Sequence, residues 1–393
     1  MHILIIPSWY KTPNNPIVGT FFEEQARMFL KRGHQVGILF PKHNLRFKDA
    51  IRLEKIKTPD SYLDEGIPTV YAFSQSFIPK VVAPTKIDVF QCCAVAYKKY
   101  KIYVERYGKP DVIHAHSMLW GGVVGSYISK KESIPLYFTK HATGWILDKK
   151  RLTSNTYKDL LAKTINQSKK TFVVSSFYKN ELLEHYEVDK HKMSVIHNIV
   201  SSLFFATPQT IQKSKPIKLI VIAYLIERKN HLTLFKAIKL LKNEGVSIVL
   251  TVIGSGPYMG VLKDFVKEEE LVDNIQFLGL LDRHNIVDEI KKSHIVVSSS
   301  IFETFGVNII EGLACGRPCV VLDSGGPRDI VRKNDGILFK DNTPIAFAKA
   351  IKTVIDNYNS YDQMEIINSC RKRFGEDQIY QELLTKYEMN ATI

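Results

Sequence analysis

Short apolar stretches alternate with longer amphipathic stretches along this chain, and the alternation runs twice. In the first half we expect strands at residues 2–7, 35–40, 111–115, 135–139, 171–174 and 193–196. The helices expected between them lie at residues 20–32, 88–106, 121–130 and 176–187. Strands that alternate with helices pair in parallel, because a helical crossover returns the chain to the edge where the next strand begins.

The alternation stops at a polar segment and then begins again. Residues 200–216 contain Pro208 and Pro216 and lack apolar periodicity, which indicates a linker. Beyond it we expect strands at residues 217–223, 246–253, 275–278, 294–297 and 319–322, and a final helix after residue 372. The sequence therefore predicts an α/β protein with two doubly wound domains, residues 1–203 and 204–372.

The composition suits two folded domains. Of 393 residues, 45% are hydrophobic and 24% are charged, a balance typical of globular proteins rather than disordered chains. The five cysteines show neither a Cys-x-x-Cys pair nor metal-ligand spacing, so we expect reduced thiols in a cytoplasmic protein. The first residues, MHILIIPSWY, are more typical of a strand than of a signal peptide, and no apolar run is long enough to span a membrane.

The net charge of +14 is concentrated in the first half of the chain. Residues 1–205 hold 30 Lys and Arg against 17 Asp and Glu, whereas residues 206–393 hold 24 against 23. One basic cluster comprises Lys42, Arg46, Lys48, Arg52, Lys55 and Lys57. The other comprises Lys98, Lys99, Lys101, Arg106 and Lys109, interleaved with tyrosines. Basic groups beside aromatic residues suit an anionic membrane surface, and the alternative is an ordinary solvated helix face. No helix-turn-helix, zinc-finger or RRM-like pattern supports nucleic acid as a partner.

Residues 295–327, IVVSSSIFETFGVNIIEGLACGRPCVVLDSGGP, carry the strongest chemical signal. Glu303 and Glu311 are eight positions apart, where an apolar strand leads through a loop into a short helix and then a second strand. A loop entering a helix N-terminus presents free N–H groups to a diphosphate, and Gly306 lets the phosphate approach closely. One carboxylate near the sugar and one near the ribose diol would complete a site for an activated sugar. The alternative is an amphipathic helix with two solvated glutamates.

This segment resembles the Glu-x7-Glu motif of the retaining nucleotide-sugar glycosyltransferases of family four, and the resemblance extends over nearly the whole chain. It implies the GT-B fold, in which two doubly wound Rossmann-like domains face an interdomain cleft and the last helix, here residues 373–393, returns to the first domain. It also implies that Glu311 holds the nucleotide ribose and that Glu303 contacts the donor sugar. The backbone that would cap the diphosphate belongs to Phe305, Gly306, Val307 and Asn308.

A second segment, VIAYLIERKN at residues 221–230, resembles a strand and turn in which the family usually shows Gly-Arg-Leu and then Lys-Gly. Lys229 matches the lysine, and the resemblance implies that it neutralises the leaving diphosphate. Tyr224 stands where the family has arginine, which is a departure from the pattern. Arg228 is a candidate to supply the missing charge.

Two more strand ends in the second half resemble donor loops of the family. Residues 251–257, TVIGSGP, contain Gly254 and Ser255, whose backbone would lie near the nucleotide, and a simple tight turn is the alternative. Residues 274–279, NIQFLG, resemble the strand that receives the nucleobase through backbone atoms of Phe277 and Leu278.

Three residues of the first half are candidates because their segments also resemble the glycosyltransferase family. Gly19 ends a long loop and would approach the donor phosphates and the reacting sugar. His141 ends the strand YFTKH and would lie beside the anomeric carbon, where it would meet the sugar or the developing positive charge. His116 is a candidate on the acceptor side, and it ends the preceding strand together with His114. The structural alternatives are a helix start for the glycine and hydrogen-bonded core positions for the histidines.

The sequence contains no Asp-x-Asp tripeptide, so we expect neither a required metal ion nor a tightly bound cofactor. We expect an enzyme that transfers a sugar, with retention, from a nucleoside diphosphate sugar, UDP in preference to GDP, with His141, Glu303 and Lys229 as catalytic residues. The expected acceptor is a lipid-linked or surface-polysaccharide precursor, including lipopolysaccharide, at the inner face of the cell membrane. The protein is expected to be cytoplasmic and peripherally attached there. The alternatives are a non-catalytic nucleotide-binding adaptor at the membrane, and an epimerase or glycan phosphorylase of the same fold.

Overall fold

In this computed structural model, the structure describes residues 1–11, 19–45, 61–64, 66–77, 84–141, 155–207 and 209–388. The chain forms two compact units. Unit 1 comprises Met1–Val174, Lys179–Ile196 and Tyr380–Ile393, and unit 2 comprises Ser175–Tyr178 and His197–Ile379. Each unit is built on a parallel sheet, which in unit 1 has one antiparallel edge strand, with helices packed on it. The prediction of two doubly wound α/β domains is therefore confirmed.

Among its described residues, unit 1 contains eight strands in the order β3-β4-β2-β1-β5-β6-β7-β8. The strands are β1 (His2–Pro7), β2 (Gln35–Asn44), β3 (Ser61–Asp64), β4 (Ile67–Gln75), β5 (Val112–His116), β6 (Leu136–Lys140), β7 (Lys170–Val173) and β8 (Met193–Val195). All neighbours pair in parallel except β3 and β4, which form an antiparallel edge. The chain order reverses at β1, so the carboxyl ends of β1 and β5 flank the crevice in which doubly wound sheets bind ligands.

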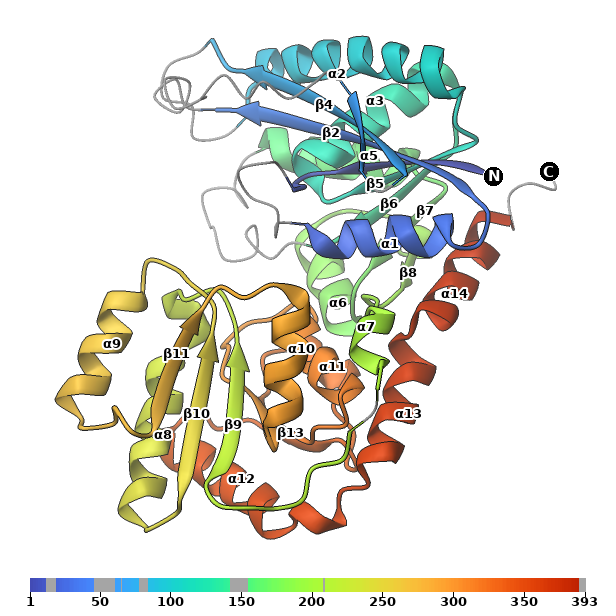
Figure 1. Cartoon of the computed structure of the whole chain (residues 1–393). Helices are drawn as coiled ribbons and strands as arrows, with labels where there is room; N and C mark the ends of the chain where they lie inside the picture. Colours follow the sequence, from blue (N-terminus) through green and yellow to red (C-terminus); the bar gives the residue numbers. More distant parts are fainter. Residues whose placement is uncertain are drawn as a thin grey trace. The chain divides into compact units, whose positions relative to one another are not determined.

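The helices and turns of unit 1 cover both faces of its sheet. They are α1 (Thr20–Leu30), α2 (Lys86–Tyr107), η2 (Met118–Gly122), α3 (Val123–Glu132), α5 (Asn155–Gln167), α6 (Ser176–His185) from Lys179 onward and η3 (Lys190–Lys192), with the end of α14 (Glu376–Glu388). Figure 1 shows α1 and α2 on opposite faces of β2. A capping box of Thr85 and Asp88 begins α2. Aromatic contacts hold α14 in unit 1, since the ring of Tyr387 lies 4.5 Å from that of Tyr137 and 5.8 Å from that of Phe29.

The described part of unit 2 contains six parallel strands in the order β11-β10-β9-β12-β13-β14. The strands are β9 (Ile217–Ile222), β10 (Ile248–Ile253), β11 (Ile275–Gly279), β12 (Ile295–Ser298), β13 (Cys319–Leu322) and β14 (Gly336–Phe339). The helices and turns are α7 (Ser202–Phe205), η4 (Glu227–Lys229), α8 (His231–Asn243), α9 (Met259–Glu268), α10 (Arg283–Lys292), α11 (Val307–Ala314), η5 (Gly326–Asp329), α12 (Pro344–Asp356), η6 (Tyr358–Ser360) and α13 (Gln363–Phe374).

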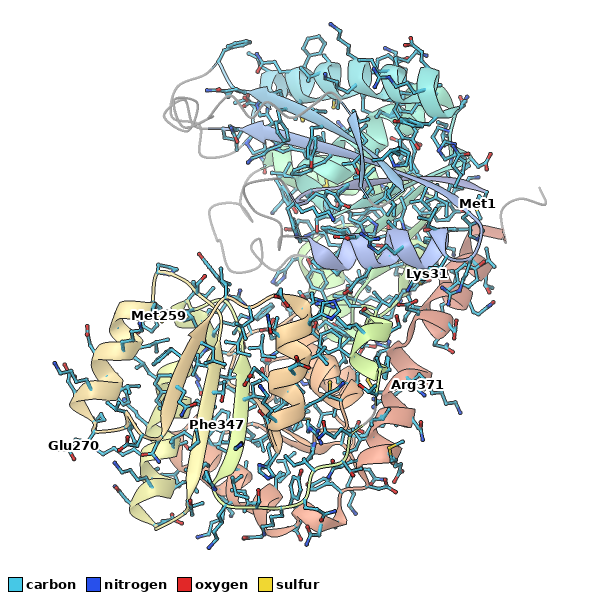
Figure 2. All side chains as sticks on the ribbon, viewed as in Figure 1. Met1, Lys31, Met259, Glu270, Phe347 and Arg371 are labelled. Atoms are coloured by element: carbon cyan, nitrogen blue, oxygen red, sulfur yellow. The ribbon has the colours of Figure 1, made fainter. Side chains whose placement is uncertain are left out.

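The core of unit 2 lies between this sheet and helices α8 and α12, which contact each other. Side chains fill the space between the strands and these helices, where Phe347 is labelled in Figure 2. Phe347 is fully buried, and Phe339 stands edge-on to it at 4.7 Å between ring centroids. Burial of such apolar surface is the main driving force for folding of the unit.

The residues that follow β8 already belong to unit 2. The division lies at residues 196/197, whereas we expected it at 203/204, and the last segment of unit 1 begins at Tyr380 rather than at residue 373. Hydrogen bonds explain the difference, because the Val200 amide donates to the Phe374 carbonyl at 2.9 Å and the Ser202 amide to Glu376 Oε1 at 3.0 Å. Within the described ranges, none of the helices has the length and apolar character needed to cross a membrane.

Candidate active site

The strand order of unit 2 locates the first group of candidate residues. Neighbouring strands follow the chain backwards from β11 to β9, and β12 then lies on the other side of β9. Ligands of open α/β sheets bind outside the carboxyl ends of the strands at such a reversal. The loops that leave β9 and β12 flank it, and they carry Lys229 and Glu303.

These two loops are bonded to each other at several points. Ser299 Oγ donates to the Lys229 carbonyl at 2.7 Å, and the Ile301 amide donates to the Arg228 carbonyl at 3.1 Å. Arg228 Nη1 donates to the Phe302 carbonyl at 2.8 Å, so this side chain helps to fix the β12 loop. The Lys229 ammonium pairs with Glu303 Oε1, and both side chains are less than one fifth exposed.

The main chain holds Glu303 in place from the side of β13. Its amide donates to the Ser324 carbonyl at 2.9 Å, and its carbonyl accepts from the Gly326 amide at 2.9 Å. Gly326 is required by this contact, because a Cβ there would lie 2.3 Å from the carbonyl carbon of Thr304. The Glu303 carboxylate therefore projects from a rigid backbone, with Lys229 as its partner.

Helix α11 begins directly after this loop. Gly306 precedes it with φ of 121° and ψ of 65°, and no side chain caps the first turn. The Ile309 amide donates back to the Gly306 carbonyl at 3.0 Å. The preceding amides, of Val307 and Asn308, have no acceptor within the helix, because the first amides of a helix lack one. Phe305 is buried, whereas Val307 and Asn308 are half-buried. The loop thus presents amide donors and the positive end of a helix dipole.

Glu311 lies one turn further along α11 and is 5% exposed. Arg283, the first residue of α10, donates from Nη1 to Glu311 Oε1 at 2.7 Å and stacks over the Phe204 ring at 4.8 Å. Burial raises the pKa of the Glu311 carboxyl, and the charge and hydrogen bond of Arg283 oppose that rise. Arg283 is a site residue that the sequence did not single out, since it precedes Glu311 by 28 positions with no local motif.

The packing of the loop after β10 explains why glycine occurs at position 254. The Gly254 amide donates to the Gly279 carbonyl at 2.8 Å, and the Ser255 carbonyl accepts from the Leu225 amide at 2.8 Å. A Cβ on Gly254 would lie 1.9 Å from the Ala223 carbonyl oxygen. Close contact between the β9 and β10 loops therefore requires glycine here.

Three other candidates lie on the same loops or strands of unit 2. Tyr224, on the β9 loop, is 58% exposed, and Leu278 of β11 is 40% exposed. Phe277 packs on the core, with its ring 6.0 Å from that of Phe235. The structure thus brings the strand-end candidates of the second half to one edge of a single sheet.

In unit 1, the histidine candidates gather at the carboxyl ends of β5 and β6. His116 Nδ1 and His141 Nε2 are 3.0 Å apart, and the two rings stack at 5.2 Å between centroids. The rings of Phe21 and Phe22, at the start of α1, lie 5.0 Å and 5.4 Å from the His141 ring. Burial, together with the other two histidines, holds the pKa of His116 well below its usual value. His116 is fully buried, whereas His141 is half-buried.

Gly19 caps the same helix α1 with a φ of 81°. A Cβ there would lie 3.0 Å from the Trp9 carbonyl oxygen and the Tyr10 Cα, so the turn requires glycine. Most of the loop before it, residues 12–18, lies outside the described residues.

His114 belongs to a hydrogen-bonded chain that the sequence did not indicate. Its Nε2 lies 2.6 Å from Thr139 Oγ1 and its Nδ1 lies 2.6 Å from the Tyr387 hydroxyl on α14. Its ring is 4.0 Å from that of His116. Burial lowers the pKa of His114 to about 3, so the neutral ring is fixed between two hydroxyls.

The basic candidates for a membrane surface lie on helix α2 of unit 1. Lys98, Lys101 and Arg106 are exposed, and Lys99 is half-buried. Lys101 is partly compensated by Glu132, 3.7 Å away. Of the other basic cluster, Arg46, Lys48, Arg52, Lys55 and Lys57 lie outside the described residues.

No three His, Cys, Asp or Glu side chains are grouped to hold a metal ion within the part of the chain that the structure describes.

Two protein-family models match the sequence, one over each half. "Glycosyltransferase Family 4" matches residues 18–202, and "Glycosyl transferases group 1" matches residues 205–369. The chain is a GT-B glycosyltransferase of the family 4 and group 1 type. The predicted glycosyltransferase type is therefore confirmed, and the retaining class stays a prediction.

Characterised and uncharacterised relatives agree with this family. An uncharacterised glycosyltransferase of Methanocaldococcus jannaschii is 27% identical over 72% of this chain and 73% of its own length. The N-acetyl-alpha-D-glucosaminyl L-malate synthase of Bacillus anthracis is 27% identical over 81% of this chain and 78% of its own length.

Solved structures share the fold at low sequence identity. Sucrose-phosphate synthase of Thermosynechococcus elongatus matches with a TM-score of 0.76 and 16% identity over 99% of both chains. The Anabaena protein HepE, solved in complex with UDP and glucose, matches with a TM-score of 0.73 and 16% identity over 99% of this chain and 100% of that one. These likenesses confirm the predicted GT-B fold.

Proposed function

We propose that this glycosyltransferase moves a sugar from a nucleoside diphosphate sugar to an acceptor hydroxyl with retention of the anomeric configuration. The observation that carries the proposal is the Lys229–Glu303 pair at the strand-order reversal of unit 2, followed directly by the uncapped start of α11. A cation and free backbone amides suit a leaving diphosphate, and the neighbouring carboxylate suits sugar hydroxyls.

We assign the nucleotide ribose to Glu311. Its Oε1 accepts from Arg283, which leaves Oε2 and further lone pairs for ribose hydroxyls. Arg283 opposes the rise in pKa that burial causes, so it favours the ionised carboxylate, which accepts hydrogen bonds only. In this role Arg283 prepares Glu311 for the ribose.

We propose UDP in preference to GDP as the nucleotide. Support comes from the HepE structure, whose fold is similar and whose complex contains UDP and glucose. The backbone of Phe277 and Leu278 on β11 would receive the base, and the Gly254–Ser255 backbone would lie beside the nucleotide.

For the chemical step we propose front-face attack, in which the departing phosphate removes the acceptor proton. Lys229 would stabilise the charge on the diphosphate, and His141 would face the developing positive charge of the sugar. Gly19 would let the start of α1 approach the reacting groups. A metal ion and a tightly bound cofactor are not needed in this scheme.

We further propose that unit 1 binds the acceptor, with His116 on that side, and that the acceptor is lipid-linked or a surface-polysaccharide precursor. The net positive charge of the first half supports attachment to the inner face of the cell membrane, with Lys98, Lys99, Lys101 and Arg106 as contributors.

The test has two stages. Thermal stabilisation by a panel of nucleotide sugars identifies the donor, because a ligand that binds only the folded state raises the melting temperature. Release of nucleoside diphosphate is then measured with membrane extract as the acceptor source, and NMR of the product defines its anomeric configuration. Donor binding without turnover would favour the non-catalytic adaptor, and an inverted product would contradict the retaining assignment.

A further inference from the structure

Unit 1 contains a groove that the reaction above does not use. It lies between helices α2, α3 and α5 and has a volume of about 960 Å³. The residues that line it are Val89, Cys93, Val123, Ser126, Tyr127, Lys130, Lys131, Leu160, Lys163, Thr164, Asn166 and Gln167. The floor is largely apolar, and Ser126 Oγ closes one side by donating to Gln167 Oε1 at 2.7 Å.

Large apolar side chains stand exposed on the helix beside this groove. On α2, Ile87 is 55% exposed and Phe90 is 71% exposed, one helical turn apart. Tyr127 of α3, which lines the groove, is 36% exposed. Ile87 and Phe90 form a small exposed apolar pair on the same helix as the groove residues Val89 and Cys93, about a quarter turn or more around the helix from them. Exposed apolar groups that gather in this way mark interaction sites.

The charges that line the groove are all positive. Lys130, Lys131 and Lys163 line it, and its lining includes no aspartate or glutamate. Among the residues that the structure describes, none of these three lysines forms an ion pair, unlike Lys101, which lies 3.7 Å from Glu132. Lys131 Nζ lies 3.9 Å from the centre of the Tyr97 ring, a contact that leaves its charge available to an anion.

We propose that this groove binds an anionic phospholipid, with an acyl chain against Val89, Val123 and Leu160 and the phosphate at the lysines. Phe90 and Ile87 would then enter the boundary between head groups and acyl chains, where aromatic and aliphatic side chains of surface-bound helices lie. The groove is larger and more apolar than a site for free phosphate needs to be. Its three lysines, with no carboxylate among the lining residues, complement a lipid phosphate. The inference deepens the membrane attachment proposed above and rests on it, but it is independent of the donor chemistry.

The test compares charge reversals in the groove with charge reversals elsewhere on unit 1. The full chain is sedimented with vesicles of phosphatidylcholine alone or with added phosphatidylglycerol. The double variant Lys130→Glu/Lys163→Glu removes two groove lysines, and the matched control Lys158→Glu/Lys190→Glu reverses two exposed lysines that do not line the groove. We expect roughly tenfold or greater loss of binding to the anionic vesicles for the groove variant, and binding within about twofold of wild type for the control.

A second pair of variants tests the apolar part without changing charge. Leu160→Trp fills the groove and Phe90→Ser removes the exposed ring, and both are expected to weaken vesicle binding while circular dichroism remains that of wild type. Stabilisation by inorganic phosphate is measured in parallel. If phosphate protects as well as the lipid does and Leu160→Trp binds vesicles normally, the site is an anion site and the lipid assignment is overturned.

Failure of this inference is separable from failure of the function proposed above. If wild type binds anionic vesicles and the groove variant binds them equally well, the groove is excluded while membrane attachment stands. If wild type binds no vesicle, the groove proposal and membrane attachment are both overturned. The donor chemistry is not affected, because nucleotide-sugar binding is measured separately in solution. Groove variants are expected to retain donor affinity, and its loss would show that they act through misfolding.

Discussion

Substitution of Arg283 by alanine is the sharpest test of how Glu311 is held. Glu311 is 5% exposed, and Arg283 Nη1 donates to it at 2.7 Å. Removal of one partner of a buried ion pair costs about 3–5 kcal/mol, because the other charge is left buried. The Arg283 side chain is 24% exposed and water can partly replace it, so we expect a loss of about 2–3 kcal/mol from the stability of unit 2.

The loss should depend on pH in a defined direction. Burial raises the pKa of Glu311 above its ordinary value of 4.5, and removal of Arg283 raises it further. A carboxyl whose folded pKa is raised favours folding when protonated, so its ionisation costs stability as the pH rises through the folded pKa. The difference between Arg283→Ala and wild type is therefore largest near neutral pH and shrinks as the pH falls toward 4.5.

Scanning calorimetry of the full chain at several pH values measures this difference. A loss of 2–3 kcal/mol corresponds to a fall of about 4–12 °C in the melting temperature of a unit of this size. Tryptophan fluorescence is the internal control, since the tryptophans within the described residues, Trp9 and Trp120, belong to unit 1. The double variant Arg283→Ala/Glu311→Gln should recover most of the stability, because it leaves no unpaired buried charge. Equal losses in the single and double variants, or a loss that does not change with pH, would refute the reasoning.

Three further substitutions test other parts of the account. Gly306→Ala should cost about 1–2 kcal/mol in urea unfolding and weaken UDP binding in calorimetry, because φ is 121° and the new Cβ would lie 2.7 Å from Ile309 Cδ1. Unchanged stability would show that the turn relaxes freely. Lys229→Ala should lower the rate of nucleoside diphosphate release roughly 10²–10³-fold, with partial recovery in Lys229→Arg, and a normal rate would exclude Lys229 from the chemistry. Tyr387→Phe removes the 2.6 Å hydrogen bond to His114 and should cost about 1 kcal/mol, measured as urea unfolding of unit 1 by tryptophan fluorescence. A stability equal to wild type would mean that the hydroxyl is not needed.

Much of the fold could be predicted because the apolar runs are short and sharply bounded. The runs at residues 2–7 and 319–322 coincide with β1 and β13. The hairpin of β3 and β4 was not predicted, and Pro68 lies near the start of β4, where proline weakens the sequence indication of a strand. The final helix expected after residue 372 corresponds to α14, which begins at Glu376, and α13 before it was not predicted. The two helices are divided at Gly375, where a Cβ would lie 2.5 Å from the Arg371 carbonyl oxygen.

The candidate site could be predicted in part. Local spacing placed Lys229 and Glu303 at strand ends, and their pairing follows from the strand order, which no single motif contains. Arg283 was missed because its contact with Glu311 joins two helices that are separated in sequence. Tyr387 was missed for the same reason, since α14 meets β5 only in the folded unit.

The surface charge was the least predictable part. Lysine clusters in the sequence do not show which side chains are compensated, and Lys101 lies beside Glu132. Of the lysines that line the groove, Lys130 and Lys131 come from α3 and Lys163 comes from α5, so the sequence does not group the two sets. Only the packing of the helices brings them together.

Calorimetric titration of UDP into wild type, Glu311→Ala and Glu268→Gln tests the central claim most directly. The claim is that the carboxylate on α11 and the free amides at the start of that helix hold a nucleoside diphosphate. We expect wild type and the exposed control Glu268→Gln to bind UDP equally, and Glu311→Ala to bind it at least tenfold more weakly, corresponding to about 1.4 kcal/mol or more. Undiminished affinity in a folded Glu311→Ala protein would contradict the account.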